Sequence, residues 1–282
     1  MMEKIKTKGV FSMGKKICMI GHRGYSARHH ENTAEAFIAA ARHGSGGVET
    51  DVRTTADGVL VLSHGGSVVL EDGRELPVES STYAQLSAKP LKNKVCNEKS
   101  YICTLRRYLE ICRDHKMICF IELKGDFSED KIIEAFEMAR EVYDLSKCML
   151  QSFQMENLIR AHELFPELQI MLTWGKDRGD YSRCFDYGFD IDASYWSANR
   201  KLLRDFHSCG LRVGLWTANT VRTLLFCRHS SFTLHQSPVS ILPLPFTRVH
   251  SPVSLHPSLS ILKPIPCAPD CGYVLGGGGV VF

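Results

Sequence analysis

Short apolar runs alternate with segments of helical spacing through most of the chain. Runs typical of strands cover residues 16–21, 46–53, 58–64, 117–124, 147–153, 168–174, 189–194 and 211–219. Between them, apolar residues recur at the spacing of one helix face, as in 31–44, 104–116, 128–143 and 154–166. This alternation predicts a parallel sheet with crossover helices. About seven such strands in roughly 200 residues favour an α/β fold of the TIM (β/α)8 type over an open sheet.

The alternation stops at about residue 219. Prolines then recur every few residues from Pro238 to Pro266, and acidic residues nearly vanish. This proline density excludes a regular helix and a central strand, because proline lacks the amide proton and restricts the backbone. We therefore divide the chain into an N-terminal extension (1–15), a barrel domain (16–219) and a Pro/Ser/Gly-rich tail (220–282) that we expect to be disordered. A misread 3′ coding region explains the tail best, and a genuine proline-rich interaction segment is the alternative.

Composition excludes several classes of protein. With 44% hydrophobic and 23% charged residues, the chain is ordinary globular protein. The net charge of +3 is small, and no basic stripe indicates a nucleic-acid partner. The N-terminus lacks the apolar core of a signal peptide, and no apolar run is long enough for a membrane anchor. The 11 cysteines form no zinc-type CxxC pair, which favours reduced thiols and a cytoplasmic protein.

Polar residues gather where the predicted strands end. The candidates are His22, Arg23, Glu49, Asp51, His64, Glu122, Lys124 and Trp216. In a barrel, the C-terminal ends of the strands meet at one face, so we expect these side chains to converge. Glu49 and Asp51 are two residues apart and project from the same face of their strand. Two such carboxylates repel each other unless a divalent cation lies between them.

The residue types predict metal-assisted phosphodiester cleavage. Carboxylate oxygens suit Mg²⁺ or Ca²⁺ rather than zinc. Arginine and lysine suit a phosphate group, and two histidines can provide a general acid and a general base. Each residue also has a structural explanation: a solvent-facing histidine, a surface ion pair of Glu122 with Lys124, or a core tryptophan. The same kind of placement on four strands favours the functional interpretation.

Three segments resemble the signature of the glycerophosphodiester phosphodiesterases. They are GHRGYSARHHENTAEAFIAA at 21–40, GGVETDVRTTADGVLVLSH at 46–64 and FIELK at 120–124. The shorter pieces QSF at 151–153 and LWTAN at 215–219 also fit, so the resemblance covers roughly residues 16–219. It implies a TIM barrel with one divalent cation, Mg²⁺ or Ca²⁺.

By motif match, the resemblance implies a role for each candidate residue. Glu49, Asp51 and Glu122 would be the metal ligands, His22 and His64 the acid and base, Arg23 and Lys124 the phosphate contacts, and Trp216 a wall of the substrate pocket. The implied reaction converts a small-molecule glycerophosphodiester, such as glycerophosphocholine, into glycerol 3-phosphate and an alcohol. Asn32 and Thr33 would cap the first helix. The assignment of acid and base, the head group and the oligomeric state stay open.

The chain departs from the family pattern at three places. His30 stands where the family has proline, and Gly65 follows His64 where the family has aspartate. Nothing after residue 219 resembles the family's closing strand and helix, so we expect a barrel that lacks its normal last βα unit. We place His29 and His30 in a loop, without a direct role. Two alternatives therefore remain: a non-catalytic or destabilised derivative, and a lysophospholipase D-type phosphodiesterase, which the polar segment after Ser63 disfavours.

Overall fold

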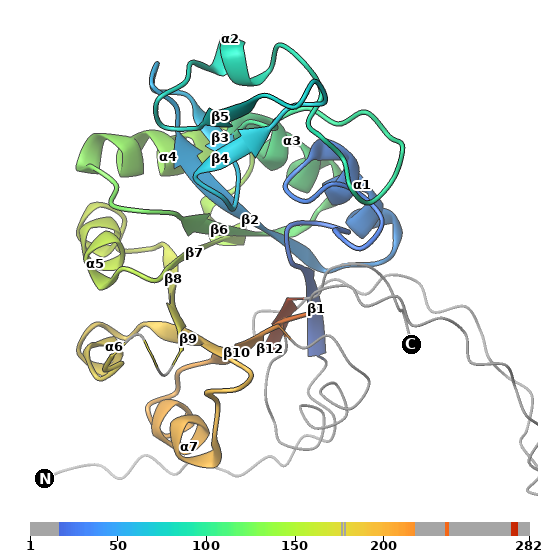
Figure 1. Cartoon of the computed structure of the whole chain (residues 1–282). Helices are drawn as coiled ribbons and strands as arrows, with labels where there is room; N and C mark the ends of the chain where they lie inside the picture. Colours follow the sequence, from blue (N-terminus) through green and yellow to red (C-terminus); the bar gives the residue numbers. More distant parts are fainter. Residues whose placement is uncertain (1–16, 176, 178, 218–234, 237–271, 276–282) are drawn as a thin grey trace, which may run out of the picture.

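The computed structural model describes residues 17–175, 177, 179–217, 235–236 and 272–275. Seven strands curve into a ring, and Figure 1 looks along its axis. They are β1 (Ile17–Gly21), β2 (Gly47–Thr54), β6 (Ile118–Leu123), β7 (Cys148–Ser152), β8 (Gln169–Trp174), β9 (Asp190–Ser194) and β10 (Val213–Trp216). From β2 to β10 in this order, each strand pairs in parallel with the next. The predicted TIM-type α/β fold is confirmed.

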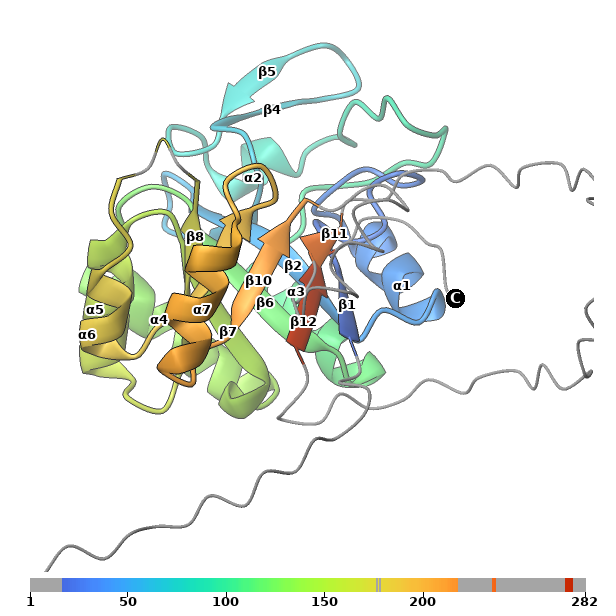
Figure 2. The same ribbon diagram turned by 90° about the horizontal axis from the view of Figure 1, so that it is seen from below.

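Strand β12 (Gly272–Leu275) lies at the remaining place in the ring. It pairs in parallel with β1, with Ile17 opposite Gly272 and Ile20 opposite Leu275, and both views show it beside β10 (Figures 1 and 2). The two-residue strand β11 (His235–Gln236) also pairs with β1. The proline pattern did not predict these strands. The GYVL segment can pair because it has no proline and carries residues that favour strands. The rest of the tail and residues 1–16 lie outside the described residues, so their predicted organisation stays a prediction.

One predicted strand runs in the opposite direction. Strand β3 (Leu60–Leu62) pairs antiparallel with β2, Val52 lying opposite Leu62, and is no member of the parallel ring. The chain then forms the hairpin of β4 (Ser67–Val69) and β5 (Glu75–Pro77) and the short helix α2 (Tyr83–Leu86). Residues 63–104, which we call the β3–α3 segment, lie beyond β2 at the side of the ring (Figure 1) and form a small core together with β3. That core contains Val61, Val68, Leu70, Val78, Leu86, Leu91 and Ile102.

Helices surround the ring on its outer side (Figures 1 and 2). They are α1 (Ala34–Arg42), α3 (Leu105–His115), α4 (Glu129–Val142), α5 (Met155–Leu164), α6 (Arg183–Tyr187) and α7 (Arg200–Ser208), with a 3-10 turn η1 (Leu145–Lys147) before β7. Their apolar faces pack on the strands, as the helical spacing predicted. A hydrogen bond also connects α3 to the sheet, since the hydroxyl of the buried Tyr108 donates to the Val48 carbonyl of β2 at 2.7 Å.

A layer of apolar side chains fills the interior of the ring. This layer consists of Ile20, Phe120, Met149 and Met171, from β1, β6, β7 and β8. Side chains two residues apart on a strand share a face, so the next inward positions belong to residues 22, 122, 151 and 173. Those positions hold polar residues, and they lie toward the C-terminal ends of the strands. The apolar layer therefore forms a floor under a polar layer.

Candidate active site

The polar layer lines a cavity of about 550 Å³ at the C-terminal ends of the strands. All predicted site residues except Asp51 line this cavity. Glu49, Glu122, Thr173 and Asp192 extend into it from β2, β6, β8 and β9, and each is at least nine-tenths buried. The expected convergence of side chains from separate strand ends is therefore present in the structure.

Three carboxylates form the centre of the site. One oxygen each from Glu49, Asp51 and Glu122 lies within 4.8 Å of the other two, and all three residues are buried. Glu49 and Asp51 lie on one face of β2, as their spacing predicted. Among the described residues, Glu49 Oε1 has no hydrogen-bond partner. A buried, unsatisfied carboxylate oxygen is costly, and a bound cation would remove that cost.

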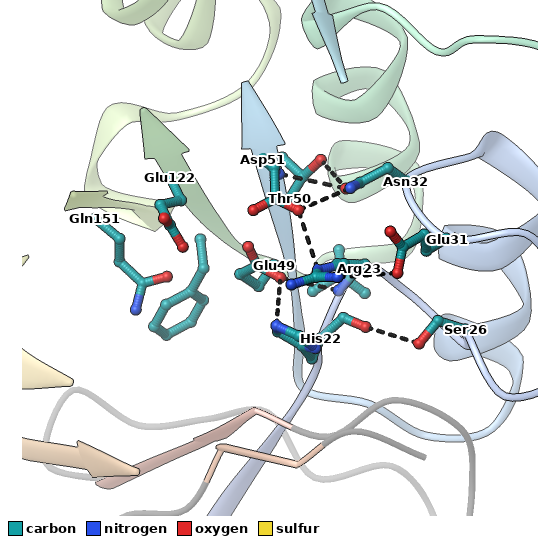
Figure 3. Close-up of polar contacts among 12 residues, drawn as sticks. His22, Arg23, Ser26, Glu31, Asn32, Glu49, Thr50, Asp51, Glu122 and Gln151 are labelled. Carbon is teal, nitrogen blue, oxygen red and sulfur yellow. Dashed lines mark hydrogen bonds and ion pairs between the residues drawn. The ribbon is translucent and has the colours of Figure 1, made fainter. Parts of the chain in front are cut away.

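Asn32 orients Asp51. Its amide donates to Asp51 Oδ2 at 2.8 Å, and its carbonyl oxygen accepts from the Thr50 hydroxyl at 2.8 Å (Figure 3). We predicted that Asn32 and Thr33 together cap α1, but only Thr33 does so, its hydroxyl accepting from the Ala36 amide at 3.4 Å. Asn32 has φ +56°, a left-handed conformation that asparagine tolerates better than most residues. The sequence pattern could not separate the two roles, because asparagine is common in both.

Two positively charged side chains, those of Arg23 and Lys124, lie against the carboxylates. Arg23 donates its backbone amide to Glu49 Oε2 at 2.9 Å, and its Nε lies 3.1 Å from Asp51 Oδ2. Lys124 Nζ lies 2.9 Å from Asp51 Oδ1 and 2.5 Å from Glu122 Oε1. Both cations also line the cavity, so each can meet an anionic group that enters it. The Glu122–Lys124 pair was weighed from the sequence as a surface ion pair, but in the structure it is mostly buried. The ion pairs of Asp51 with Arg23 and Lys124 were not predicted.

The carboxylates differ in their affinity for protons. Burial, with the Asp51 and Glu122 charges, raises the pKa of Glu49 well above its ordinary value. Burial also raises the pKa of Glu122 to about 7, against the opposing effect of Lys124. For Asp51, burial acts upward, but the charges of Lys124 and Arg23 outweigh it and lower the pKa to about 2. Without a cation, the site therefore retains a proton near neutral pH, which a divalent ion would displace.

The two histidines have different surroundings. His22 is mostly buried, and its Nε2 lies 3.9 Å from Glu49 Oε2 (Figure 3). Burial, reinforced by the Arg23 charge, lowers the pKa of His22 to about 3. His64 is exposed, and partial desolvation of its ring followed by the Arg23 charge lowers its pKa too. Both imidazoles are thus neutral at pH 7 in the ligand-free protein. Among the described residues, no hydrogen bond orients the His64 ring, consistent with Gly65 in place of aspartate.

His64 reaches the site by a route that the sequence did not predict. We expected it at the end of a parallel strand, whereas β3 is antiparallel. Strand β2 continues as far as Thr54, and β3 folds back along it until Leu62 lies opposite Val52. The Ser63 amide donates to the Asp51 carbonyl at 2.9 Å, which fixes the residue before His64.

Aromatic side chains form one wall of the cavity. The Trp216 indole donates to the Asp192 carbonyl at 3.0 Å, and its ring meets the Phe153 ring edge-on at 5.7 Å. The Phe153 ring also faces Lys124 Nζ at 5.5 Å from its centroid. Trp216 was predicted as a wall residue, but Phe153 and Asp192 were not named as site residues. Phe153 belongs to the QSF piece that fits the family motif, and Asp192 lies within a predicted strand, but neither signal by itself marks a residue of the cavity wall.

The fold and the site together define a (β/α)-barrel enzyme whose strand ends gather carboxylates, cations and neutral histidines around one cavity. The family model of the glycerophosphoryl diester phosphodiesterases matches residues 22–233. The chain therefore belongs to this family, as the motifs indicated.

Individual proteins agree with this assignment. Bovine glycerophosphodiester phosphodiesterase 1 is 34% identical over 116 residues, which are 39% of this chain and about a third of the bovine protein (34%). The rat protein of the same name is 24% identical over 246 residues, covering 73% of this chain and 72% of its own length. Among solved structures, an Oleispira antarctica phosphodiesterase in complex with the product sn-glycerol-3-phosphate has a TM-score of 0.68 at 21% identity, covering 76% of this chain and 90% of that one. At that identity, the likeness shows the fold alone.

No helix in the described part of the chain combines the length and the apolar character needed to cross a bilayer.

Proposed function

We propose that this chain hydrolyses glycerophosphodiesters to glycerol 3-phosphate and an alcohol, using a divalent cation held by Glu49, Asp51 and Glu122. The observation that carries the proposal is the placement of three buried carboxylates within 4.8 Å, next to two cations and two neutral histidines, at one cavity. Family membership supports the same reaction. We propose a small, water-soluble substrate and a cytoplasmic location.

The site has the donors that Mg²⁺ or Ca²⁺ requires. Its ligands are hard carboxylate oxygens, and Glu49 Oε1 is buried without a hydrogen-bond partner among the described residues. When bound, such an ion polarises a phosphoryl oxygen and positions the attacking oxygen. The chain's own part is to keep the three oxygens together: Asn32 and Arg23 hold Asp51, and the Arg23 amide holds Glu49.

The histidines transfer the protons. His22 is neutral and lies beside the carboxylates, so its Nε2 can accept a proton from the attacking hydroxyl. His64 borders both the main cavity and a second cavity of about 290 Å³, which lies between the β1–α1 loop and the β3–α3 segment. A leaving alcohol in the second cavity would therefore meet His64. We accordingly assign His22 as the base and His64 as the acid, which the bound phosphate's negative charge would help to protonate.

The cations and the aromatic wall would bind the substrate. Arg23 and Lys124 line the cavity and present N–H groups that can donate to phosphate oxygens. Trp216 and Phe153 offer apolar faces for the carbon chain of the glycerol. Arg23 and Lys124 form ion pairs with Asp51 and Glu122. To bind a phosphate as well, each positively charged side chain must contact the carboxylate and the phosphate at the same time.

The decisive experiment measures glycerol 3-phosphate released from glycerophosphocholine by the purified full-length protein with Mg²⁺, with Ca²⁺ and with EDTA. We expect release with a divalent ion, none with EDTA, and a loss of at least about 100-fold in His22→Ala. The matched control is His115→Ala, which removes an exposed imidazole at the end of α3 and should leave the rate unchanged.

Other outcomes distinguish the alternatives. Release of choline from lysophosphatidylcholine, but none from glycerophosphocholine, would establish the lysophospholipase D-type reaction. No release from protein that unfolds cooperatively would establish a folded, non-catalytic derivative. Equal rates with a divalent ion and with EDTA would contradict the metal-dependent mechanism.

A further inference from the structure

A second group of potential metal ligands lies outside the active site. It consists of His29, in the loop between β1 and α1, and Cys96 and Glu98, in the β3–α3 segment. The group shares no residue with the Glu49, Asp51 and Glu122 cluster. It joins two loops that are far apart along the chain, since His29 and Glu98 are 69 positions apart.

The three side chains point at one another. His29 Nδ1 lies 2.7 Å from Glu98 Oε2, and one ligand atom from each of the three residues lies within 4.8 Å of the other two. Nitrogen, sulfur and oxygen ligands of one zinc ion are about 3.3–3.8 Å apart, because each bond is about 2.0–2.3 Å long and the geometry is tetrahedral. Small rotations of exposed or half-buried side chains would therefore bring these atoms to ligand distances.

The neighbouring residues hold the ligands in place. Asn93 Nδ2 donates to Cys96 Sγ at 3.1 Å and to the Glu98 carbonyl at 3.1 Å. Its side-chain oxygen accepts from the Val95 amide at 2.9 Å and the Cys96 amide at 3.3 Å. The Cys96 sulfur thus acts as an acceptor in a turn that one side chain organises. Such a hydrogen bond is the kind that supports a metal-bound thiolate.

The His29 ring is also supported on its own side. It lies 5.9 Å from the Tyr25 ring, which packs on the His43 ring at 4.5 Å. These contacts connect His29 to the C-terminal end of α1, where His43 follows the last helical residue. His29 is therefore anchored to the end of α1, whereas Cys96 and Glu98 are held by the turn that Asn93 organises.

We propose that His29, Cys96 and Glu98 form a zinc-binding site. A thiolate, an imidazole and a carboxylate are all common ligands of Zn²⁺, whereas the carboxylate cluster of the active site suits Mg²⁺ or Ca²⁺. The Cys96 thiol releases its proton to solvent as the sulfur–zinc bond forms, and a water molecule fills the fourth position. This inference is independent of the proposed hydrolysis.

The site would connect the walls of the second cavity. His30 and Val95, the neighbours of His29 and Cys96, both line the cavity of about 290 Å³ that His64 also borders. A zinc ion bound to both loops would hold these walls at a fixed separation. A plain ion pair of His29 with Glu98 would do this less firmly, because both side chains are partly exposed.

The test uses the full-length protein, freed of metals and then saturated with Mg²⁺ to fill the active site. Co²⁺ is titrated in as a spectroscopic substitute for Zn²⁺, and the thiolate-to-cobalt charge-transfer band is recorded. We expect one equivalent of Co²⁺ to produce this band and one equivalent of Zn²⁺ to abolish it. The Cys96→Ser variant should lack the band, and Asn93→Ala should bind about 10–100-fold more weakly.

Matched variants exclude the other sources of a band. Cys209→Ser removes an exposed thiol elsewhere, and Cys267→Ser/Cys271→Ser removes two thiols of the tail. Both should keep the band, as should Glu122→Gln, which alters only the active site. The proposal is overturned if the wild type shows no band, if Cys96→Ser retains it, or if it disappears with the tail cysteines. Because the readout is metal binding, failure of the hydrolysis proposal would leave this result unaffected.

Discussion

Replacing Glu122 with glutamine should reveal how much free energy the ionisation of the buried Glu122 carboxyl costs the folded protein. Burial raises the pKa of Glu122 from 4.5 to about 7 in the metal-free protein. Between these values the folded state binds more protons than the unfolded state, so this residue's contribution to stability falls as pH rises. The shift corresponds to roughly 3 kcal/mol at about 1.4 kcal/mol per unit of pKa. Glutamine has no such titration, because its amide stays neutral.

The assay is urea unfolding in EDTA, followed by tryptophan fluorescence at several pH values from 4.5 to 8. We expect the free energy of unfolding of Glu122→Gln, relative to wild type, to increase by roughly 3 kcal/mol across this range. Taking the difference cancels the opposite contribution of His22, whose lowered pKa stabilises the fold as pH rises from about 3 to 6.5. The control Glu141→Gln changes an exposed residue of α4 and should give a flat difference. A flat or falling difference for Glu122→Gln would refute the reasoning.

Three further predictions concern the same architecture. Affinity for Mg²⁺, measured by calorimetry, should rise between pH 6 and pH 8, because Glu122 must lose its proton to bind the ion; an affinity independent of pH would contradict this. Asn32→Ala should weaken Mg²⁺ binding about 10–100-fold by releasing Asp51, with Asn199→Ala at the start of α7 as the control. Tyr108→Phe should destabilise the fold by about 1–2 kcal/mol in urea unfolding without changing Mg²⁺ affinity, because the Val48 carbonyl loses its donor.

Most of the ring could be predicted from the sequence. Parallel strands buried on both faces are nearly continuous apolar runs, and the runs at 117–124 and 147–153 became β6 and β7. The run at 58–64 has the same composition but became the antiparallel β3. Strand direction depends on the connection to the preceding strand, and the five residues between Thr54 and Leu60 are too few for a crossover to a parallel strand. The GYVL strand was missed because four residues next to a proline-rich stretch give a weak local signal.

For the active site, the sequence by itself determined which chemical groups are available and that they lie at strand ends. The two-residue period placed Glu49 and Asp51 on one face, and the motif order indicated the family. Local patterns contain no distances between strands, so they could not show that Lys124 lies between Asp51 and Glu122, or that Asn32 orients Asp51.

Only the tertiary structure decided which of these groups meet and what environment they share. Burial raises the pKa of Glu122 while nearby cations lower that of Asp51, although both are carboxylates at strand ends. The structure likewise brought His29 to Cys96 and Glu98, three residues that no spacing rule connects. The chemistry of a side chain is a property of the residue. Its neighbours, its burial and the electrostatic effect of nearby charges arise only when distant segments pack together.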